Sequence, residues 1–202
     1  MNILAFETSH SEASVALCIE NEVFEKRIVS QKKHEETVMP AVVALLDEHS
    51  ISVSDLDLVA VDVGPGSFTG IRIGICHANA IADAVNIPCI GVCALEAMIY
   101  GVSYESAIGA MIEAGNDNCY GALFDNSHKY IMGPEATSIH DFLERISDMS
   151  CNSILKDTDG FLPSAGAISM LAKEKYSEIG YINTRALPLY LRPSQAERKR
   201  TT

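Results

Sequence analysis

Short apolar runs alternate with polar turns through the first half of the chain. Residues 2–8, 13–19 and 22–29 are three such runs, and their spacing predicts three consecutive antiparallel strands. Residues 56–63 are almost continuously apolar, which is typical of a strand buried on both faces. Residues 89–92 resume the strand pattern after a break. The first half therefore contains five predicted strands.

Two segments between these strands follow the helical period. Residues 34–50 carry apolar side chains on one face and charges on the other, although Pro40 must lie in the first turn or kink the helix. Residues 71–85 are rich in Ala and Ile, and the residues around Pro88 end this second helix. Together the patterns predict the element order βββαβαβ.

The second half repeats this order with a weaker signal. We expect strands at residues 107–112, 118–124, 129–132 and 151–155, and helices at residues 138–147 and 164–175. No self-similar sequence supports a true repeat, and no Pro/Gly/Ser-rich linker separates the halves. We therefore predict two packed lobes, an N-terminal lobe over residues 1–98 and a reduced C-terminal lobe over residues 99–202.

The loop between the fourth strand and the second helix has the sequence GPGSFTG, from Gly64 to Gly70. Glycines let a backbone approach closely, and a helix N-terminus presents unpaired N–H groups to an anion, so the loop suits phosphate or a carboxylate. Ser67 and Thr69 add hydroxyls, and Arg72 follows in the first helical turn. The alternative is a tight strand-to-helix turn that Ser67 or Thr69 caps.

Small residues recur every four positions along the second helix, which allows another helix to approach closely. This stripe either packs on the chain's own sheet or faces a partner. Ile71 and Ile75 compete for the inward face, so we predict a partner interface that also uses the apolar face of the first helix. The expected interface residues are Val38, Val42, Leu45, Gly70, Gly74, Ala78 and Ala82.

Charge and cysteine usage narrow the choice of partners. The chain has 27 acidic and 15 basic residues and a net charge of −12, which disfavours unaided binding to a polyanion. The only basic cluster, residues 198–200, is a solvated end or a weak nucleic-acid contact. Six scattered cysteines indicate reduced thiols, most of them buried. No apolar run reaches the roughly 18 residues of a membrane span, so we expect a soluble, cytoplasmic protein.

Five further polar residues are candidates for chemistry. Ser9, His10 and Glu12 suggest a nucleophile, a base and an acid, but neighbours on one tight turn do not usually aim at one another, so we expect turn residues. Asp62 ends the buried strand and either caps the loop or lies beside a bound phosphate. His77, on the second helix, is expected in the core or at an interface.

Four stretches resemble the TsaB (YeaZ) family: FETSHSEASVAL, HEETVMPAVVALL, GPGSFTGIRIG and PLYLRP. The resemblance is strong over residues 1 to about 100, thin over 101–185, and returns at 188–193. It implies an α/β, actin-like fold of the acetate and sugar kinase, Hsp70 and actin kind, with two ribonuclease H-like lobes and a reduced second lobe.

The resemblance also implies a role. TsaB proteins act with the catalytic paralogue TsaD, and with TsaC and TsaE, to form N6-threonylcarbamoyladenosine next to the anticodon of tRNA. We therefore expect a non-catalytic scaffold for TsaD, a homodimer when alone, with no cofactor of its own and with ATP or ADP at or near the partner interface. The alternatives are an independent actin-fold ATPase or phosphotransferase, a metallopeptidase, and an interaction module unrelated to tRNA.

Departures from the family pattern shape the expected site. The catalytic paralogue holds a metal through two histidines one helical turn apart, whereas His34 is followed by Val38, so no metal site is expected. Glu7 stands where the first actin-fold strand often ends in a magnesium-managing Asp, which implies a weak or absent ATPase. The basic segment of the second lobe matches residues 113–116, which lack an arginine. The expected phosphate- or nucleotide-binding residues are Thr8, Ser9, Gly64, Gly66, Ser67, Thr69 and Arg72.

Overall fold

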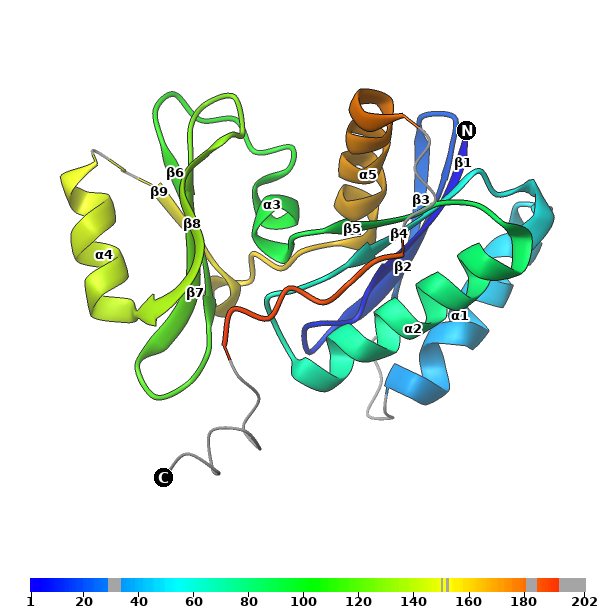
Figure 1. Ribbon diagram of the computed structural model, residues 1–202, viewed down its shortest axis with the longest axis horizontal. Helices are drawn as coiled ribbons and strands as arrows, with labels where there is room; N and C mark the ends of the chain where they lie inside the picture. The colour runs from blue at the N-terminus through cyan, green and yellow to red at the C-terminus, as the bar shows by residue number, and fades with distance from the viewer. Residues whose placement is uncertain (29–33, 150, 152, 181–184, 193–202) are drawn as a thin grey trace.

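The computed structural model describes residues 1–28, 34–149, 151, 153–180 and 185–192. The chain forms two α/β lobes that lie side by side, each built around one sheet (Figure 1). The basic cluster at residues 198–200 lies outside the described residues, so its predicted roles stay predictions.

The first lobe contains a five-stranded sheet in the order β3-β2-β1-β4-β5. Its strands are β1 (Asn2–Glu7), β2 (Ala13–Ile19), β3 (Glu22–Ile28), β4 (Leu58–Asp62) and β5 (Cys89–Val92). β1, β2 and β3 form the predicted antiparallel meander, and β4 and β5 run parallel to β1. All five residues of β4 are buried, as its continuous apolar run predicted.

Helices cover both faces of this sheet (Figure 1). α1 (His34–Glu48) and α2 (Phe68–Val85) pack against side chains such as Leu4 and Phe6, whereas α5 (Ala165–Ile179) packs against Ile3 and Ala5. Alternate residues of β1 point to opposite faces, so both helical layers share one strand. Pro40 lies inside α1, beyond its first turn.

The second lobe contains a four-stranded sheet in the order β8-β7-β6-β9. Its strands are β6 (Ile108–Glu113), β7 (Asn118–Phe124), β8 (Tyr130–Ser138) and β9 (Ser153–Lys156). One face packs on α3 (Ala94–Ile99) and the other on α4 (Ile139–Asp148). Single 3₁₀ turns, η1 (Val53–Asp55) and η2 (Asp157–Asp159), precede β4 and follow β9.

Two elements of the second lobe differ from the sequence-based prediction. β8 extends to Ser138 rather than ending near residue 132, because pairing with β7 carries it past Gly133 and Pro134, which look like a turn in the sequence. α3 was not predicted, since its six residues are too short for a helical period to show.

The C-terminal part of the chain contributes to the first lobe as well. α5 packs on β1, β2 and β4, and Ala186 joins the core beneath α1 and α2. The division of the chain at residue 98 stays a prediction. The structure adds that the polypeptide crosses from one sheet to the other more than once.

The cysteines behave as the sequence predicted. All six are free thiols, and four are buried: Cys18, Cys89, Cys93 and Cys119. Burial raises the pKa of Cys89 to about 12 and that of Cys93 to about 11, so both stay protonated and unreactive near neutral pH. No helix among the described residues is long and apolar enough to cross a bilayer.

Candidate functional site

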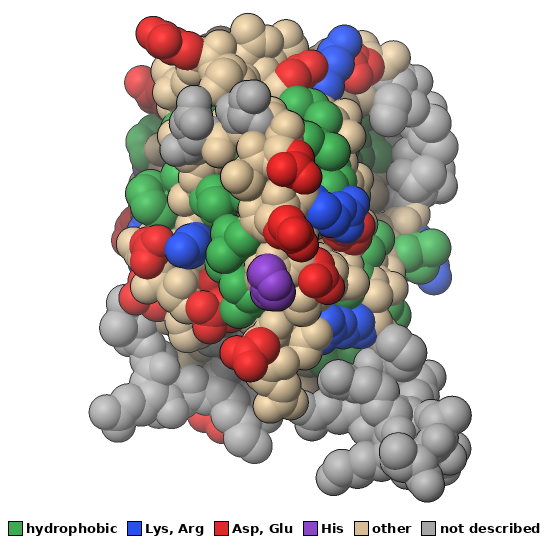
Figure 2. Space-filling view, turned by 90° about the vertical axis from the view of Figure 1, so that its left-hand side faces the viewer, with side chains coloured by type: hydrophobic (Ala, Val, Ile, Leu, Met, Phe, Trp, Pro, Cys, Tyr) green, Lys and Arg blue, Asp and Glu red, His purple; other side chains and the backbone are tan. Residues whose placement is uncertain are grey.

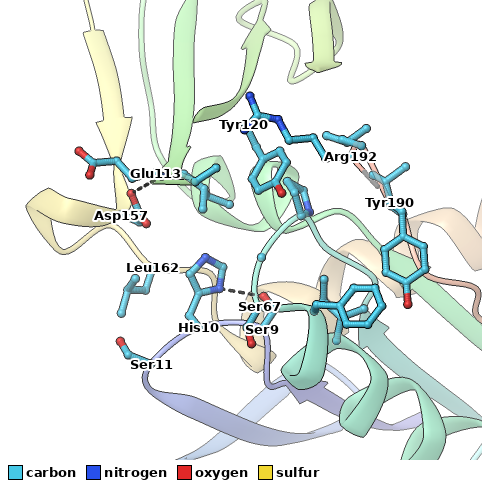
Figure 3. A pocket seen from close by; sticks show the side chains of 18 of the residues that line it. Ser9, His10, Ser11, Ser67, Glu113, Tyr120, Asp157, Leu162, Tyr190 and Arg192 are labelled. Carbon is cyan, nitrogen blue, oxygen red and sulfur yellow. Dashed lines mark hydrogen bonds between the residues drawn. The ribbon is translucent and has the colours of Figure 1, made fainter. Parts of the chain in front are cut away.

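A cavity of about 570 Å³ lies between the two lobes (Figure 3). The first lobe lines it with the β1–β2 turn and with the start of α2, including Ser9, His10 and Ser67. The second lobe contributes Glu113 and Tyr120, and η2 contributes Asp157 and Thr158. We call this cavity the interlobe cleft. It is bordered by the turn that follows β1 and by the loop that follows β4.

The loop Gly64–Gly70 packs against the β1–β2 turn at the floor of the interlobe cleft. The Ser67 N–H donates a hydrogen bond to the carbonyl oxygen of Ser9 at 2.8 Å, and Thr8 Oγ1 donates to the carbonyl oxygen of Gly70 at 2.7 Å. A β-carbon at Gly66 would lie 2.7 Å from the Ser9 carbonyl oxygen. The glycines therefore permit close approach to the chain's own backbone.

Ser67 caps α2, because its hydroxyl accepts a hydrogen bond from the Gly70 N–H at 3.3 Å. This cap starts the helix at Phe68, three residues before the predicted start. These contacts are those of a tight strand-to-helix turn, which is one of the two interpretations of the loop given by the sequence.

The structure divides the seven expected phosphate-binding residues into three groups. Ser9, Gly66 and Ser67 line the interlobe cleft, so phosphate binding there stays a prediction. Thr8 and Gly64 are buried and already hydrogen-bonded, since the Gly64 N–H donates to Asp62 Oδ1 at 2.6 Å. These two side-chain and backbone groups are therefore already engaged inside the chain, and phosphate binding by the set of seven stays a prediction.

Thr69 and Arg72 form the third group, in a groove that adjoins the interlobe cleft at Phe68. They line a shallow groove of about 370 Å³ together with Phe68, Ile73, Cys76 and His77. Arg72 Nε donates to the Tyr190 hydroxyl at 2.8 Å, and its guanidinium carbon lies 3.9 Å from the centroid of the Phe68 ring. Arg72 is thus held by the aromatic side chains of Phe68 and Tyr190.

A cluster of polar side chains lies buried beneath the interlobe cleft. Glu7 and Asp62 end the parallel strands β1 and β4 and are 0% and 1% exposed. Ser9 Oγ lies 3.0 Å from Glu7 Oε1 and 2.8 Å from His10 Nδ1, and it donates a hydrogen bond to Asp62 Oδ2. His10 Nδ1 also lies 3.2 Å from Glu7 Oε1. We call Glu7, Ser9, His10 and Asp62 the buried cluster.

The buried cluster corrects one sequence-based expectation. Ser9 and His10, taken as turn residues unable to face each other, do so at hydrogen-bonding distance. Glu12 points away and lies 3.8 Å from Arg27 at the surface. Asp62 caps the loop as predicted. The missed signal was topological: Glu7 and Asp62 end adjacent parallel strands, and the carboxyl ends of such strands meet at one edge of a sheet.

Burial and mutual charge shift the proton affinities of the buried cluster. Burial, followed by the negative charge of Glu7, raises the pKa of Asp62 to about 7, against opposing contributions from His10, Ser9 and the Gly64 N–H. Burial alone would lower the pKa of His10, but the hydrogen bond to Glu7 and the charges of Glu7 and Asp62 raise it above 6.5 overall. The Asp62 carboxyl and the His10 imidazole thus retain their protons to higher pH than usual.

The same geometry argues against a serine-protease-like relay. In such a relay one ring nitrogen of the histidine faces the serine and the other faces the acid. Here the single atom Nδ1 of His10 faces both Ser9 and Glu7. The cluster has the residue types of a relay but not its arrangement.

Three members of the buried cluster have metal-binding groups. One ligand atom from each of Glu7, His10 and Asp62 can be chosen so that all three lie within 4.8 Å of one another. The expectation of no metal site concerned the α1 position His34, whose side chain lies outside the described structure, so it stays a prediction.

The expected partner stripe is buried inside the chain itself, which is a correction for all seven residues. Val38, Val42, Leu45, Ala78 and Ala82 are at most 3% exposed. Gly70 and Gly74 are buried so close to Thr8 that a β-carbon at either position would overlap its atoms. The small residues let α2 lie directly on the end of β1. His77 is half-buried in the groove that contains Thr69 and Arg72, and burial lowers its pKa.

The segment 185–192 crosses from the first lobe to the second along the interlobe cleft (Figure 1). Asn79 exchanges two hydrogen bonds with the backbone of Ala186, at 2.9 and 3.0 Å, and the Leu189 N–H donates to the Val63 carbonyl oxygen at 2.8 Å. Arg192 then donates to Asn118 Oδ1 in the second lobe at 2.8 Å. We call residues 185–192 the strap, because it is bonded to both lobes.

Comparison with known proteins gives consistent matches. A family model described as TsaD, tRNA N6-adenosine threonylcarbamoyltransferase, matches residues 21–181. The tRNA threonylcarbamoyladenosine biosynthesis protein TsaB of Bacillus subtilis (strain 168) is 29% identical, over 98% of this chain and 97% of its own. TsaB of Escherichia coli (strain K12) is 28% identical, over 98% of each chain.

Solved structures match over nearly the whole chain. YeaZ from Pseudomonas aeruginosa superposes with a TM-score of 0.77 at 24% identity, covering 94% of this chain and 99% of that one. A second structure, described as similar to peptidase YEAZ from Pseudomonas aeruginosa, gives a TM-score of 0.80, also at 24% identity, with 95% and 99% coverage. The predicted α/β, actin-like fold with ribonuclease H-like lobes is confirmed.

Proposed function

This chain belongs to the TsaD family of tRNA N6-adenosine threonylcarbamoyltransferases, among its TsaB (YeaZ) members, and from this premise we propose that it acts in forming N6-threonylcarbamoyladenosine in tRNA as a non-catalytic partner of TsaD. One observation carries the proposal. Both TsaB relatives match 98% of this chain over 97% and 98% of their own lengths, so the likeness to proteins named for this pathway extends over both lobes.

Surface charge supports a role in which another protein holds the tRNA. The net charge of −12 opposes binding to a polyanion. Figure 2 shows the side of the second lobe that carries α4, where acidic side chains are spread over the face among fewer basic ones. Asp141, Glu144 and Asp148 are exposed on α4, and Arg145 is paired with Glu135 at 2.5 Å. This face repels tRNA.

The interlobe cleft supports a non-catalytic role. Its rim carries the carboxylates of Glu113 and Asp157, which repel phosphate groups. Arg192 is the one Lys or Arg side chain among the described residues that line it, and it is bonded to Asn118 Oδ1 and to the Thr137 carbonyl oxygen. The buried cluster below does not form a Ser–His–acid relay. The cleft thus favours neither unaided phosphoryl transfer nor acyl transfer.

The outer faces of α1 and α2 are the surface that we assign to TsaD. Val43 on α1 is 53% exposed and Phe68 at the start of α2 is 38% exposed, both large for apolar side chains. The groove containing Ile73 and Cys76 lies on the same side of α2. Apolar side chains left on two helices are suited to a helical interface. The chain alone forms a homodimer through this face, and ATP or ADP is held at or near the contact with TsaD.

Reconstitution tests the proposal. The purified chain is combined with TsaD, TsaC, TsaE, ATP, threonine, bicarbonate and unmodified tRNA from the same organism, and the modified nucleoside is measured by mass spectrometry. We expect product only when this chain is present, and co-elution of the chain with TsaD. Equal product with and without the chain would defeat the proposal.

Matched surface variants locate the contact. Val43→Glu and Ile73→Glu place a charge on the outer faces of α1 and α2, whereas His140→Glu places one on exposed α4, away from that surface. The first two should abolish co-elution with TsaD and the His140 variant should not. Unfolding midpoints close to the wild type would show that each variant is folded.

The independent ATPase remains the rival function, because the interlobe cleft is large enough for a small ligand. Calorimetry with Mg·ATP and a hydrolysis assay on the chain alone separate the two functions. We expect no turnover by the lone chain. Tight binding with turnover would favour the rival.

A further inference from the structure

We propose that Glu7, Asp62 and His10 form a binding site for one divalent cation of the Mn²⁺ or Zn²⁺ class at the base of the interlobe cleft. The site goes beyond the proposed function, because it lies within this chain and needs neither TsaD nor tRNA. It also departs from the sequence-based expectation of no metal site, which considered α1 alone.

The distances suit an ion after a small adjustment. Ligand atoms lie about 2.0–2.2 Å from such a cation, so two of them stand at most about 4.4 Å apart. The chosen atoms of Glu7, His10 and Asp62 already lie within 4.8 Å of one another. Bringing these ligand atoms to the spacing that a bound cation needs requires movements of a few tenths of an ångström, which small changes in side-chain torsions can supply.

The rigidity of the surroundings favours a preformed site. Glu7 and Asp62 occupy the ends of two paired strands, β1 buried from Ile3 onward and β4 throughout, and Asp62 is further held by the Gly64 N–H at 2.6 Å. His10 follows Glu7 by three residues and is only 7% exposed at its side chain. Ligands held by a sheet lose little conformational freedom when an ion binds.

Charge gives the second argument. Two carboxylates that are 0% and 1% exposed face one imidazole, and no Lys or Arg side chain bonds to either carboxylate among the described residues. Buried carboxylates are costly unless paired or bound to a metal. A divalent cation would balance both charges at once.

A buried carboxylate oxygen without a hydrogen-bond partner is an independent observation that points to a ligand. Glu7 Oε1 accepts a hydrogen bond from the Ser9 N–H at 2.8 Å and lies 3.0 Å from Ser9 Oγ, but Glu7 Oε2 is fully buried and has no hydrogen-bond partner in the described structure. Buried polar atoms without partners are rare in folded proteins. A bound cation would satisfy this oxygen.

The donor set indicates the class of cation. Two carboxylates suit the harder divalent ions and an imidazole suits first-row transition metals, so the mixed set fits Mn²⁺ and Zn²⁺ better than Ca²⁺ or Mg²⁺. The buried cluster contains no thiolate, which argues against softer ions. Ser9 and His10 also line the interlobe cleft, so an ion reaches the site from there and keeps one position open toward it (Figure 3).

Ser9 Oγ now occupies the point at which the three ligands converge. It makes hydrogen bonds with Glu7, His10 and Asp62. Rotation about the Ser9 side-chain torsion would free that point or turn the hydroxyl into a fourth oxygen ligand. Ser9→Ala therefore tests the geometry without removing any of the three proposed ligands.

Mn²⁺ titration of the full chain tests the site. The chelator-treated protein is titrated with Mn²⁺ alone while the free ion is followed by electron paramagnetic resonance. Mn²⁺ is chosen because the six cysteines of the chain compete for Zn²⁺ far more strongly. We expect one Mn²⁺ bound per chain, displaced by Zn²⁺, with the broadened spectrum of a protein-bound ion.

Matched variants complete the test. Asp62→Asn and Glu7→Gln should each weaken Mn²⁺ binding by more than the roughly 10–100-fold cost of losing an outer partner of a ligand. Glu113→Gln and Asp157→Asn, at the cleft rim, should bind as the wild type does. If Glu7→Gln does not fold, the Mn²⁺ titration of Asp62→Asn still tests the site. No stoichiometric binding, or equal binding by Asp62→Asn and wild type, would overturn the site. Neither result would bear on tRNA modification, which is measured separately.

Discussion

Thr8 and Gly70 hold each other in a reciprocal contact. Thr8 Oγ1 donates a hydrogen bond to the Gly70 carbonyl oxygen at 2.7 Å, and a β-carbon at residue 70 would overlap the Thr8 carbonyl oxygen. The contact joins the end of β1 to the first turn of α2. It fixes where α2 lies on the sheet and therefore where the floor of the interlobe cleft lies.

Replacing Gly70 by Ala should destabilise the chain. Because the overlap is with backbone, the residue cannot be accommodated by a rotamer change, and overpacking of this kind costs roughly 1–3 kcal/mol. The loss should exceed the helix-propensity gain of about 1 kcal/mol. Urea denaturation measures the change. Ala80→Ser, on the exposed face of α2, is the control and should change stability by less than about 1 kcal/mol.

The inward face of α2 should tolerate charge far less than its outer face. Ala78→Asp buries a carboxylate at a position that is 0% exposed, so we expect a loss of several kcal/mol or an unfolded chain. Cys76→Asp lies on the exposed side of the same helix and should change stability by less than about 1 kcal/mol. Thermal unfolding of both variants checks this. A stable Ala78→Asp monomer would instead indicate that the small-residue stripe of α2 faces the surface.

Asp62 should make stability fall as the pH rises. Its pKa is about 7 in the folded chain, above the ordinary value of 3.8, so the folded state holds the proton more tightly than the unfolded state does. The stability that this proton contributes to the folded state is therefore lost as the pH rises from about 4 to 7. The raised pKa of His10 acts in the same direction at higher pH, because its contribution is present below 6.5 and is lost as pH rises through the folded-state pKa.

Asp62→Asn should therefore flatten this pH dependence. Asn resembles the protonated acid and can still accept from the Gly64 N–H. Urea midpoints from about pH 4 to 8, in the presence of a chelator, should show the variant gaining stability relative to wild type as the pH rises. Glu113→Gln, an exposed carboxyl at the cleft rim, should keep the wild-type profile. Parallel profiles for wild type and Asp62→Asn would contradict the assignment.

Asn79 should hold the strap to the first lobe. Asn79→Ala removes both hydrogen bonds to Ala186, each worth about 0.5–1.5 kcal/mol, so stability should fall by roughly 1–3 kcal/mol. The Leu189 amide, bonded to Val63, should exchange its hydrogen faster. Asp83→Asn removes only an exposed ion pair to Arg185 and should change stability by less than about 1 kcal/mol. Unaltered exchange at Leu189 in Asn79→Ala would show that other contacts hold the strap.

Periodicity along the chain was enough to predict the first sheet, α1 and α2. β2 and β5 have the predicted bounds, and the bounds of the other three strands shift by one or two residues at an end. These elements are local, since alternation of apolar side chains and the Ser67 cap act within a few residues. The glycines of the Gly64–Gly70 loop also marked a close backbone approach correctly, although the approaching group is the chain's own Thr8–Ser9 turn.

Other features depend on residues far apart in the sequence, which no local pattern can report. The length of β8 follows from pairing with β7, and the direction of the small-residue stripe follows from where α2 meets β1. The buried cluster exists because β1 and β4 are neighbours and end at the same edge, which brings Glu7 and Asp62 together across more than fifty residues. Two unremarkable carboxyl groups become a buried, charge-coupled pair only when the sheet closes around them.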